Sequence, residues 1–104
     1  MKILTHKIKN AHLPQNMRGW GNGYIGLPPE HPWYNKHYND IECNVHGGLT
    51  YAANHPDGYW WIGFDTAHLY DNIHNCPESY VDKQIQLMKE QASLATQTIQ
   101  KLKE

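Results

Sequence analysis

The pattern of hydrophobic and polar residues changes near residue 77. Before it, apolar residues come in short runs separated by turn-forming residues, which is typical of strands and loops. After it, apolar residues recur at alternating steps of four and three, and no glycine or proline interrupts residues 78–104. The pattern predicts a single domain over residues 1–104, with a strand- and loop-rich region at 1–76 and a C-terminal helix at 77–104.

Within the first region, short apolar or alternating runs predict an antiparallel meander. The adjacent Gly47 and Gly48 are typical of a two-residue hairpin loop, because both central positions of that turn favour positive φ. Residues 31–40 predict a single helical turn or an ordered loop. The predicted strands are a short strand or arm within residues 1–19, then Tyr24–Leu27, Ile41–Val45, Leu49–Ala53 and a central, most buried strand at Tyr59–Phe64.

The C-terminal helix has a predicted start and a predicted apolar face. Ser79 is the expected N-cap, with Asp82 completing a weak capping box. The heptad seam consists of Val81, Ile85, Met88, Ala92, Ala95, Ile99 and Leu102. Packing of this seam on the sheet is favoured over a coiled-coil dimer, and both are compatible if the helix overhangs a small sheet. Leu87 and Leu94 lie one heptad apart on a neighbouring stripe. The expected fold class is α+β, a small antiparallel sheet packed against one long helix.

The charge balance limits the classes of partner. Nine basic and ten acidic side chains give a formal net charge of −1, which disfavours binding to a nucleic-acid polymer or to an anionic membrane surface. Binding of a small ligand is compatible with this charge. Eight histidines raise the expectation of a metal or acid–base site, because histidine is the commonest metal ligand and titrates near neutrality.

The cysteines and the N-terminus indicate a cellular context. Cys43 and Cys76 form no C-x-x-C pair and are expected to be free thiols. The first nine residues are too mixed in polarity for a signal peptide, and no apolar run approaches the ~20 residues of a membrane span. A soluble, cytoplasmic protein is therefore expected.

Two histidines and a carboxylate form the candidate metal set. If the segment after residue 64 turns helically, Asp65, His68 and Asp71 can converge. With His46 from the hairpin, Asp65 and His68 would make an open two-histidine, one-carboxylate site for zinc or manganese. A general base would then be Asp71 or Asp40. The alternative is that Asp65 and His68 form only a mutual hydrogen bond at the end of the strand.

Glycines and aromatic residues support a different ligand site. Backbone N–H groups at His46–Gly48 can approach a phosphate, although no lysine or Walker pattern accompanies them. The glycines alone are typical of a structural turn. Four tryptophans and seven tyrosines against one phenylalanine suit stacking on a base or anchoring a partner protein. Trp20 and Trp33 are the better-placed tryptophans, and one of Trp60 and Trp61 must face away from the core.

Several sequence words resemble those of a family of small proteins encoded by phages and prophages. They are Gly23–Ile25, His31–Pro32, Val45–Thr50 and Trp60–His68, within about residues 20–71. The resemblance implies a compact phage accessory protein in a bacterial cytoplasm, where such proteins counter host defences. It implies no particular reaction.

These observations give three hypotheses of function. The first is a non-catalytic protein whose homo-oligomer sequesters a small nucleotide-like ligand and needs no cofactor. Its expected ligand-binding residues are Trp20, Trp33, His46, Gly47, Gly48, Trp60, Asp65 and His68. The second is a metal-dependent hydrolase or phosphoesterase with zinc or manganese on His46, Asp65 and His68. The third is a protein-binding inhibitor of a host defence factor.

Overall fold

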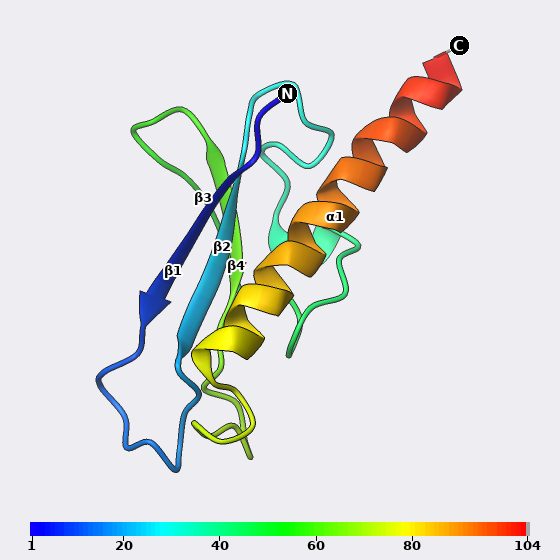
Figure 1. The fold of residues 1–104 in the computed structure, drawn as a ribbon. Coiled ribbons are helices and arrows are strands. Elements are labelled where there is room, and N and C mark those ends of the chain that lie inside the picture. Colours follow the sequence, from blue (N-terminus) through cyan, green and yellow to red (C-terminus); the bar gives the residue numbers. More distant parts are fainter. Residues whose placement is uncertain (104) are drawn as a thin grey trace.

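Over residues 1–103, four antiparallel strands and one long helix make up the fold in the computed structural model (Figure 1). The structure describes the backbone of residues 1–103 and the side chains of these residues except Ile99, Gln100 and Lys103. The elements are β1 (Leu4–Lys9), β2 (Gly21–Leu27), the short 3₁₀ turn η1 (Tyr38–Asp40), β3 (Tyr51–Asn54), β4 (Trp60–Phe64) and α1 (Glu78–Lys103). The α+β arrangement predicted from the sequence, a sheet packed against a C-terminal helix, is confirmed.

The sheet consists of two hairpins that lie side by side. Its strand order is β1-β2-β4-β3, with β2 and β4 antiparallel in the centre. The expected central position of the aromatic strand is therefore confirmed for Trp60–Phe64. The second hairpin joins the first through β4, so that β3 becomes an edge strand.

The prediction of a strand at Ile41–Val45 is wrong, and so is the hairpin that it was to form across Gly47–Gly48. The backbone N–H of Asn44 donates to Oε1 of Gln91 at 2.7 Å, and its carbonyl accepts from Nε2 of the same side chain at 2.7 Å. A helix glutamine thus occupies the place of a neighbouring strand. Gly47 and Gly48 do have the predicted positive φ, 67° and 79°, in a turn closed from Gly48 N–H to the Val45 carbonyl.

One face of the sheet and the apolar seam of α1 enclose the core. Alternation along each strand puts the buried side chains of β2 and β4 on the face toward the helix. These are Ile25, Leu27, Ile62 and Phe64, and they pack with Val81, Ile85, Met88 and Ala92 of α1. Gly23 allows the close approach, because a Cβ there would lie 2.6 Å from Ile85 Cγ1.

The helix begins one residue before the expected cap and extends beyond the sheet. Val81 N–H donates to the Pro77 carbonyl, so that Pro77 rather than Ser79 occupies the N-cap position. The seam is buried as far as Ala92, whereas Leu102 is 82% exposed and lies on the projecting end (Figure 1). The predicted seam side chain of Ile99 and the predicted last helical residue, 104, lie outside the described residues.

The connection between β2 and β3 closes the remaining side of the core. Residues 31–40 form turns and η1, as expected, and carry the buried Trp33. His31 is also buried: its Nε2 lies 2.8 Å from the Ala92 carbonyl oxygen of α1, and its Nδ1 accepts from Trp33 N–H at 3.0 Å. Within residues 1–103, no helix combines the length and the apolar character needed to cross a membrane.

Candidate functional site

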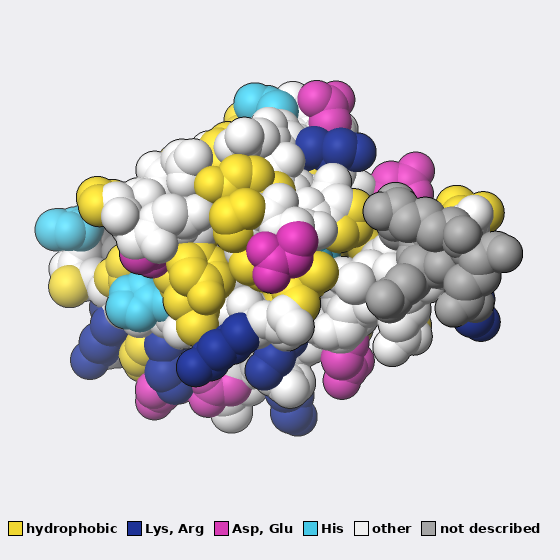
Figure 2. All heavy atoms as spheres, turned by 90° about the horizontal axis from the view of Figure 1, so that it is seen from above, with side chains coloured by type: hydrophobic (Ala, Val, Ile, Leu, Met, Phe, Trp, Pro, Cys, Tyr) yellow, Lys and Arg dark blue, Asp and Glu magenta, His cyan; other side chains and the backbone are white. Residues whose placement is uncertain are grey.

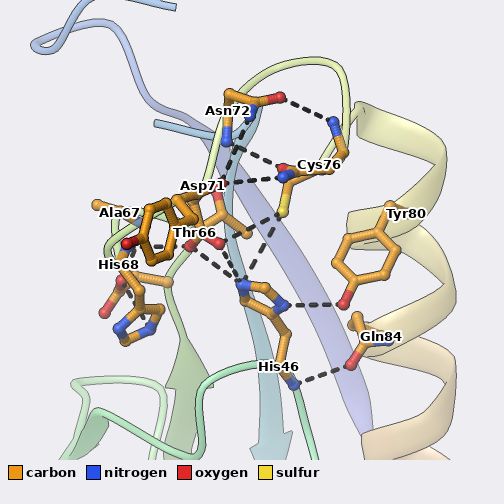
Figure 3. Close-up of polar contacts among 12 residues, drawn as sticks. His46, Thr66, Ala67, His68, Asp71, Asn72, Cys76, Tyr80 and Gln84 are labelled. Atoms are coloured by element: carbon orange, nitrogen blue, oxygen red, sulfur yellow. Dashed lines mark hydrogen bonds and ion pairs between the residues drawn. The ribbon is translucent and has the colours of Figure 1, made fainter. Parts of the chain in front are cut away.

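Two side chains of α1 position His46. Its backbone N–H donates to Gln84 Oε1 at 2.9 Å, and its Nδ1 lies 2.8 Å from the hydroxyl of Tyr80 (Figure 3). Because the backbone and Nδ1 are both fixed by the helix, Nε2 points toward the loop between β4 and α1. The second ring nitrogen of His46 therefore has a defined direction.

Asp71 and Cys76 of that loop meet Nε2 of His46. The two carboxylate oxygens of Asp71 lie 2.9 and 3.0 Å from Nε2, and Asp71 Oδ2 also accepts from His68 N–H at 2.9 Å. The Cys76 sulfur lies 3.9 Å from the same nitrogen and 3.8 Å from Asp71 Oδ1. Nitrogen, oxygen and sulfur thus face one point, a cluster that we call the His46 centre.

The surroundings of the His46 centre separate the acidities of its members. Desolvation opposes ionisation of Asp71, but hydrogen bonds from His46 and from His68 N–H hold the pKa of this carboxyl below its ordinary value. Burial, reinforced by the charge of Asp71, raises the pKa of the Cys76 thiol to about 11. The centre therefore pairs a carboxylate with a neutral thiol.

A second histidine–aspartate pair lies beside the His46 centre. His68 Nε2 is 3.2 Å from Asp65 Oδ1, without the alignment of a hydrogen bond, and Asp65 accepts from the Thr50 hydroxyl at 2.9 Å. The ring packs directly on Gly47, where a Cβ would lie 2.3 Å from Nε2. The mutual hydrogen bond expected between Asp65 and His68 is not formed, although the two side chains lie beside each other at the end of β4.

The predicted ligand set of His46, Asp65 and His68 does not meet at one point. The two imidazole rings lie 5.8 Å apart between centroids, and each faces its own aspartate. Asp71, expected to converge with Asp65 and His68 and to be a possible base, takes the position assigned to Asp65, whereas Asp40 lies exposed in η1. Among the described residues, the set that brings three metal-binding atom types together is His46, Asp71 and Cys76.

Trp20, Trp33 and Trp60 pack against the core and do not line the hollow where a ligand could stack. Trp33 is buried in the core, which contradicts its expected ligand contact. Trp20 packs partly against the core, with Lys7 Nζ 5.4 Å from its ring centroid. Trp60 also packs against the core and donates to the Lys36 carbonyl. The tryptophan on the outer face of the sheet is Trp61.

Trp61 belongs to a hollow on the face of the sheet opposite α1. Its ring lies against Gly26, and that of Tyr24 against Gly63, so glycines in the neighbouring strands let both rings lie close to the sheet. The hollow has a volume of about 730 Å³. We call it the aromatic hollow, lined by Lys2, Ile3, Leu4, Thr5, His6, Ile8, Tyr24, Tyr51, His55, Asp57 and Trp61.

The end of the molecule that carries the N-terminus and the β3–β4 hairpin has a mixed surface. Figure 2 looks onto this end and shows apolar side chains lying among histidine and lysine or arginine side chains.

Comparisons with protein-family models, curated proteins and solved structures found no match. Function is therefore inferred from the aromatic hollow and the His46 centre alone.

Proposed function

We propose that the protein binds and sequesters a small, planar, anionic ligand of the nucleotide class in the aromatic hollow. The supporting observation is a hollow of about 730 Å³ on a sheet face that α1 does not cover, lined by the rings of Tyr24, Tyr51 and Trp61. A hollow of this size suits a small ligand, and aromatic rings provide stacking surfaces for a base.

The polar residues of the aromatic hollow suit the edges of such a ligand. Lys2, His6 and His55 supply cationic or hydrogen-bonding groups for a phosphate. Asp57 accepts from Tyr59 N–H at 2.9 Å and from Trp61 Nε1 at 3.0 Å. The hydrogen bond from Tyr59 chiefly lowers the pKa of this carboxyl, so that it stays a hydrogen-bond acceptor for an exocyclic amino group.

Binding of the ligand is sufficient for this function, and no catalytic step is required. Sequestration of a nucleotide-derived signal inside a bacterial cell by a phage accessory protein is the biological setting in which we place it. Assembly of several copies belongs to the same proposal, since Leu94 and Leu102 are 59% and 82% exposed on the second half of α1. Apolar side chains in this position favour contact between copies.

A fluorescence titration tests the proposal. Nucleoside monophosphates and cyclic dinucleotides are added to the protein, and quenching of tryptophan emission gives the affinity. Tyr51→Ala should weaken binding by about 5- to 150-fold, because loss of one stacked base contact costs about 1–3 kcal/mol. The matched control is Leu69→Ala, since Leu69 is 83% exposed and does not line the hollow.

Two outcomes would contradict the proposal. One is the absence of quenching by every nucleotide at millimolar concentration. The other is an equal loss of affinity in Tyr51→Ala and Leu69→Ala. Sedimentation of the same samples gives the number of copies, and Leu94→Glu should lower it if copies meet through the projecting helix.

A further inference from the structure

We infer that His46, Asp71 and Cys76 form a binding site for one zinc ion, through Nε2, a carboxylate oxygen and Sγ. This site is separate from the aromatic hollow, and the inference does not depend on the proposed function. Three segments of the chain meet at this site (Figure 3). They are the turn after residue 45, the loop before α1, and α1 itself.

The separations of the three ligand atoms fit a tetrahedral ion. Ligand atoms at the usual zinc distances of about 2.0–2.3 Å lie about 3.3–3.6 Å from one another when the angles are tetrahedral. The observed separations are 2.9 Å for nitrogen to oxygen and 3.8 and 3.9 Å for sulfur to oxygen and nitrogen. These values bracket the required range, so small side-chain movements suffice to accommodate the ion.

The groups around the ligands are arranged as an outer shell. When Nε2 of His46 binds an ion, Nδ1 carries the proton and donates to the Tyr80 hydroxyl, 2.8 Å away. Asp71 keeps one oxygen for the ion, while Oδ2 accepts from His68 N–H at 2.9 Å. A second partner on both the imidazole and the carboxylate is typical of metal ligands, because it fixes their orientation.

The ligand types favour zinc over the other metal considered from the sequence. Thiolate and imidazole suit zinc, whereas manganese favours carboxylates, carbonyls and water. Asp71 and Cys76 are buried, and the His46 side chain is 18% exposed. Three protein ligands leave the fourth position of a tetrahedral ion for a water molecule, as in sites where zinc activates water.

Cobalt spectroscopy on the full chain tests the inference. The protein is stripped with chelator and titrated with Zn²⁺ alone against a chromophoric competitor, and in parallel with Co²⁺. We expect one equivalent of zinc per chain and, with cobalt, a thiolate-to-metal charge-transfer band. Cys76→Ser should abolish the band and weaken zinc binding at least tenfold, whereas Cys43→Ser, which removes the other free thiol, should change neither.

Two further variants keep the test decisive if Cys76→Ser does not fold. Tyr80→Phe retains all three ligands but removes the outer-shell acceptor, and should weaken zinc binding about 10- to 100-fold. His68→Gln should leave the cobalt band in place, since the imidazole of His68 is not a ligand. The inference is overturned if wild-type protein binds less than one equivalent of zinc, if its cobalt spectrum lacks the thiolate band, or if binding persists unchanged in Cys76→Ser, which would indicate adventitious binding by other histidines.

Discussion

The glycine pair after His46 allows a matched test of how the two histidines are held together. φ is 67° at Gly47 and 79° at Gly48, so both backbones are left-handed. A Cβ at Gly47 would lie 2.3 Å from His68 Nε2, whereas a Cβ at Gly48 would meet nothing within 4 Å. Gly48→Ala therefore measures the cost of the backbone conformation alone, and Gly47→Ala adds the displacement of the His68 ring.

The difference between the variants follows from the local contacts. In both variants the free energy of unfolding falls by about 1–2 kcal/mol, because an L-residue is strained in the left-handed region. In Gly47→Ala the His68 ring must also leave its rotamer, at about 0.5–1.5 kcal/mol. Its ion pair with Asp65, in which both side chains are about one third exposed, is weakened as well, which contributes at most ~1 kcal/mol. Gly47→Ala should therefore lower the free energy of unfolding by about 0.5–2.5 kcal/mol more than Gly48→Ala.

Urea denaturation and calorimetry measure this difference directly. For a domain of this size it corresponds to a melting temperature roughly 2–20 °C lower for Gly47→Ala than for Gly48→Ala. The NMR signals of the His68 imidazole should shift in Gly47→Ala only. Equal losses of stability in the two variants, with unchanged His68 signals, would refute the packing of this ring on Gly47.

Two further predictions concern acidity. Burial lowers the pKa of His31, and its hydrogen bond to a helix carbonyl opposes this shift only in part. Below pH about 6.5 the unfolded chain therefore binds more protons at this histidine than the folded chain does. The stability that His31 contributes above that pH is lost as the pH falls. The stability of His31→Gln, measured by urea denaturation from pH 5 to 8, should depend less on pH than that of the wild type, and an unchanged slope would contradict the argument. In the metal-free protein, burial also raises the pKa of Cys76 to about 11, so the thiol of chelator-treated protein should react with a disulfide reagent at pH 8 only after addition of urea. Fast reaction of Cys76→Ser protein would identify Cys43 as the accessible thiol. Fast reaction that is lost in that variant would contradict the burial of Cys76.

The helix and the central strands were predictable because burial leaves a periodic record in the sequence. Val81, Ile85, Met88 and Ala92 recur at helical spacing, and all four are buried against the sheet. The aromatic run of Trp60–Phe64 likewise marks the central strand β4. The helix is thus identified by the period of its apolar residues and the strand by its continuous apolar run, since both elements are buried in the core.

The segment Ile41–Val45 was not predictable, because alternation does not identify the hydrogen-bonding partner. A half-buried extended chain alternates in polarity whether its backbone pairs with a strand or with side chains. Here Gln91 pairs with both backbone groups of Asn44. In the sequence, Gln84 and Gln91 resemble residues of a solvated helix face. Their contacts with the distant residues 44–46 have no signature in the local sequence.

The His46 centre was partly predictable for a related reason. His46 and the neighbourhood of Asp65, His68 and Asp71 were identified from their residue types, but the helical turn assumed after Asp65 is interrupted. Tyr70 has φ of 73°, and this change of direction turns the Asp71 carboxylate back to His68 N–H and toward His46. Spacing rules assume one regular conformation, so they cannot rank two aspartates in an irregular loop.

The polar stripe of α1 explains why the His46 centre forms at all. Tyr80, Gln84 and Gln91 lie at steps of four and seven, one position before the buried seam residues Val81, Ile85 and Ala92. The same helix therefore buries its seam in the core and presents hydrogen-bonding groups along the seam's edge, where they fix the backbone of residues 44–46 and Nδ1 of His46. Since packing of the seam sets the rotation of the helix, the core determines the direction of Nε2. The centre is thus a consequence of how the helix docks on the sheet.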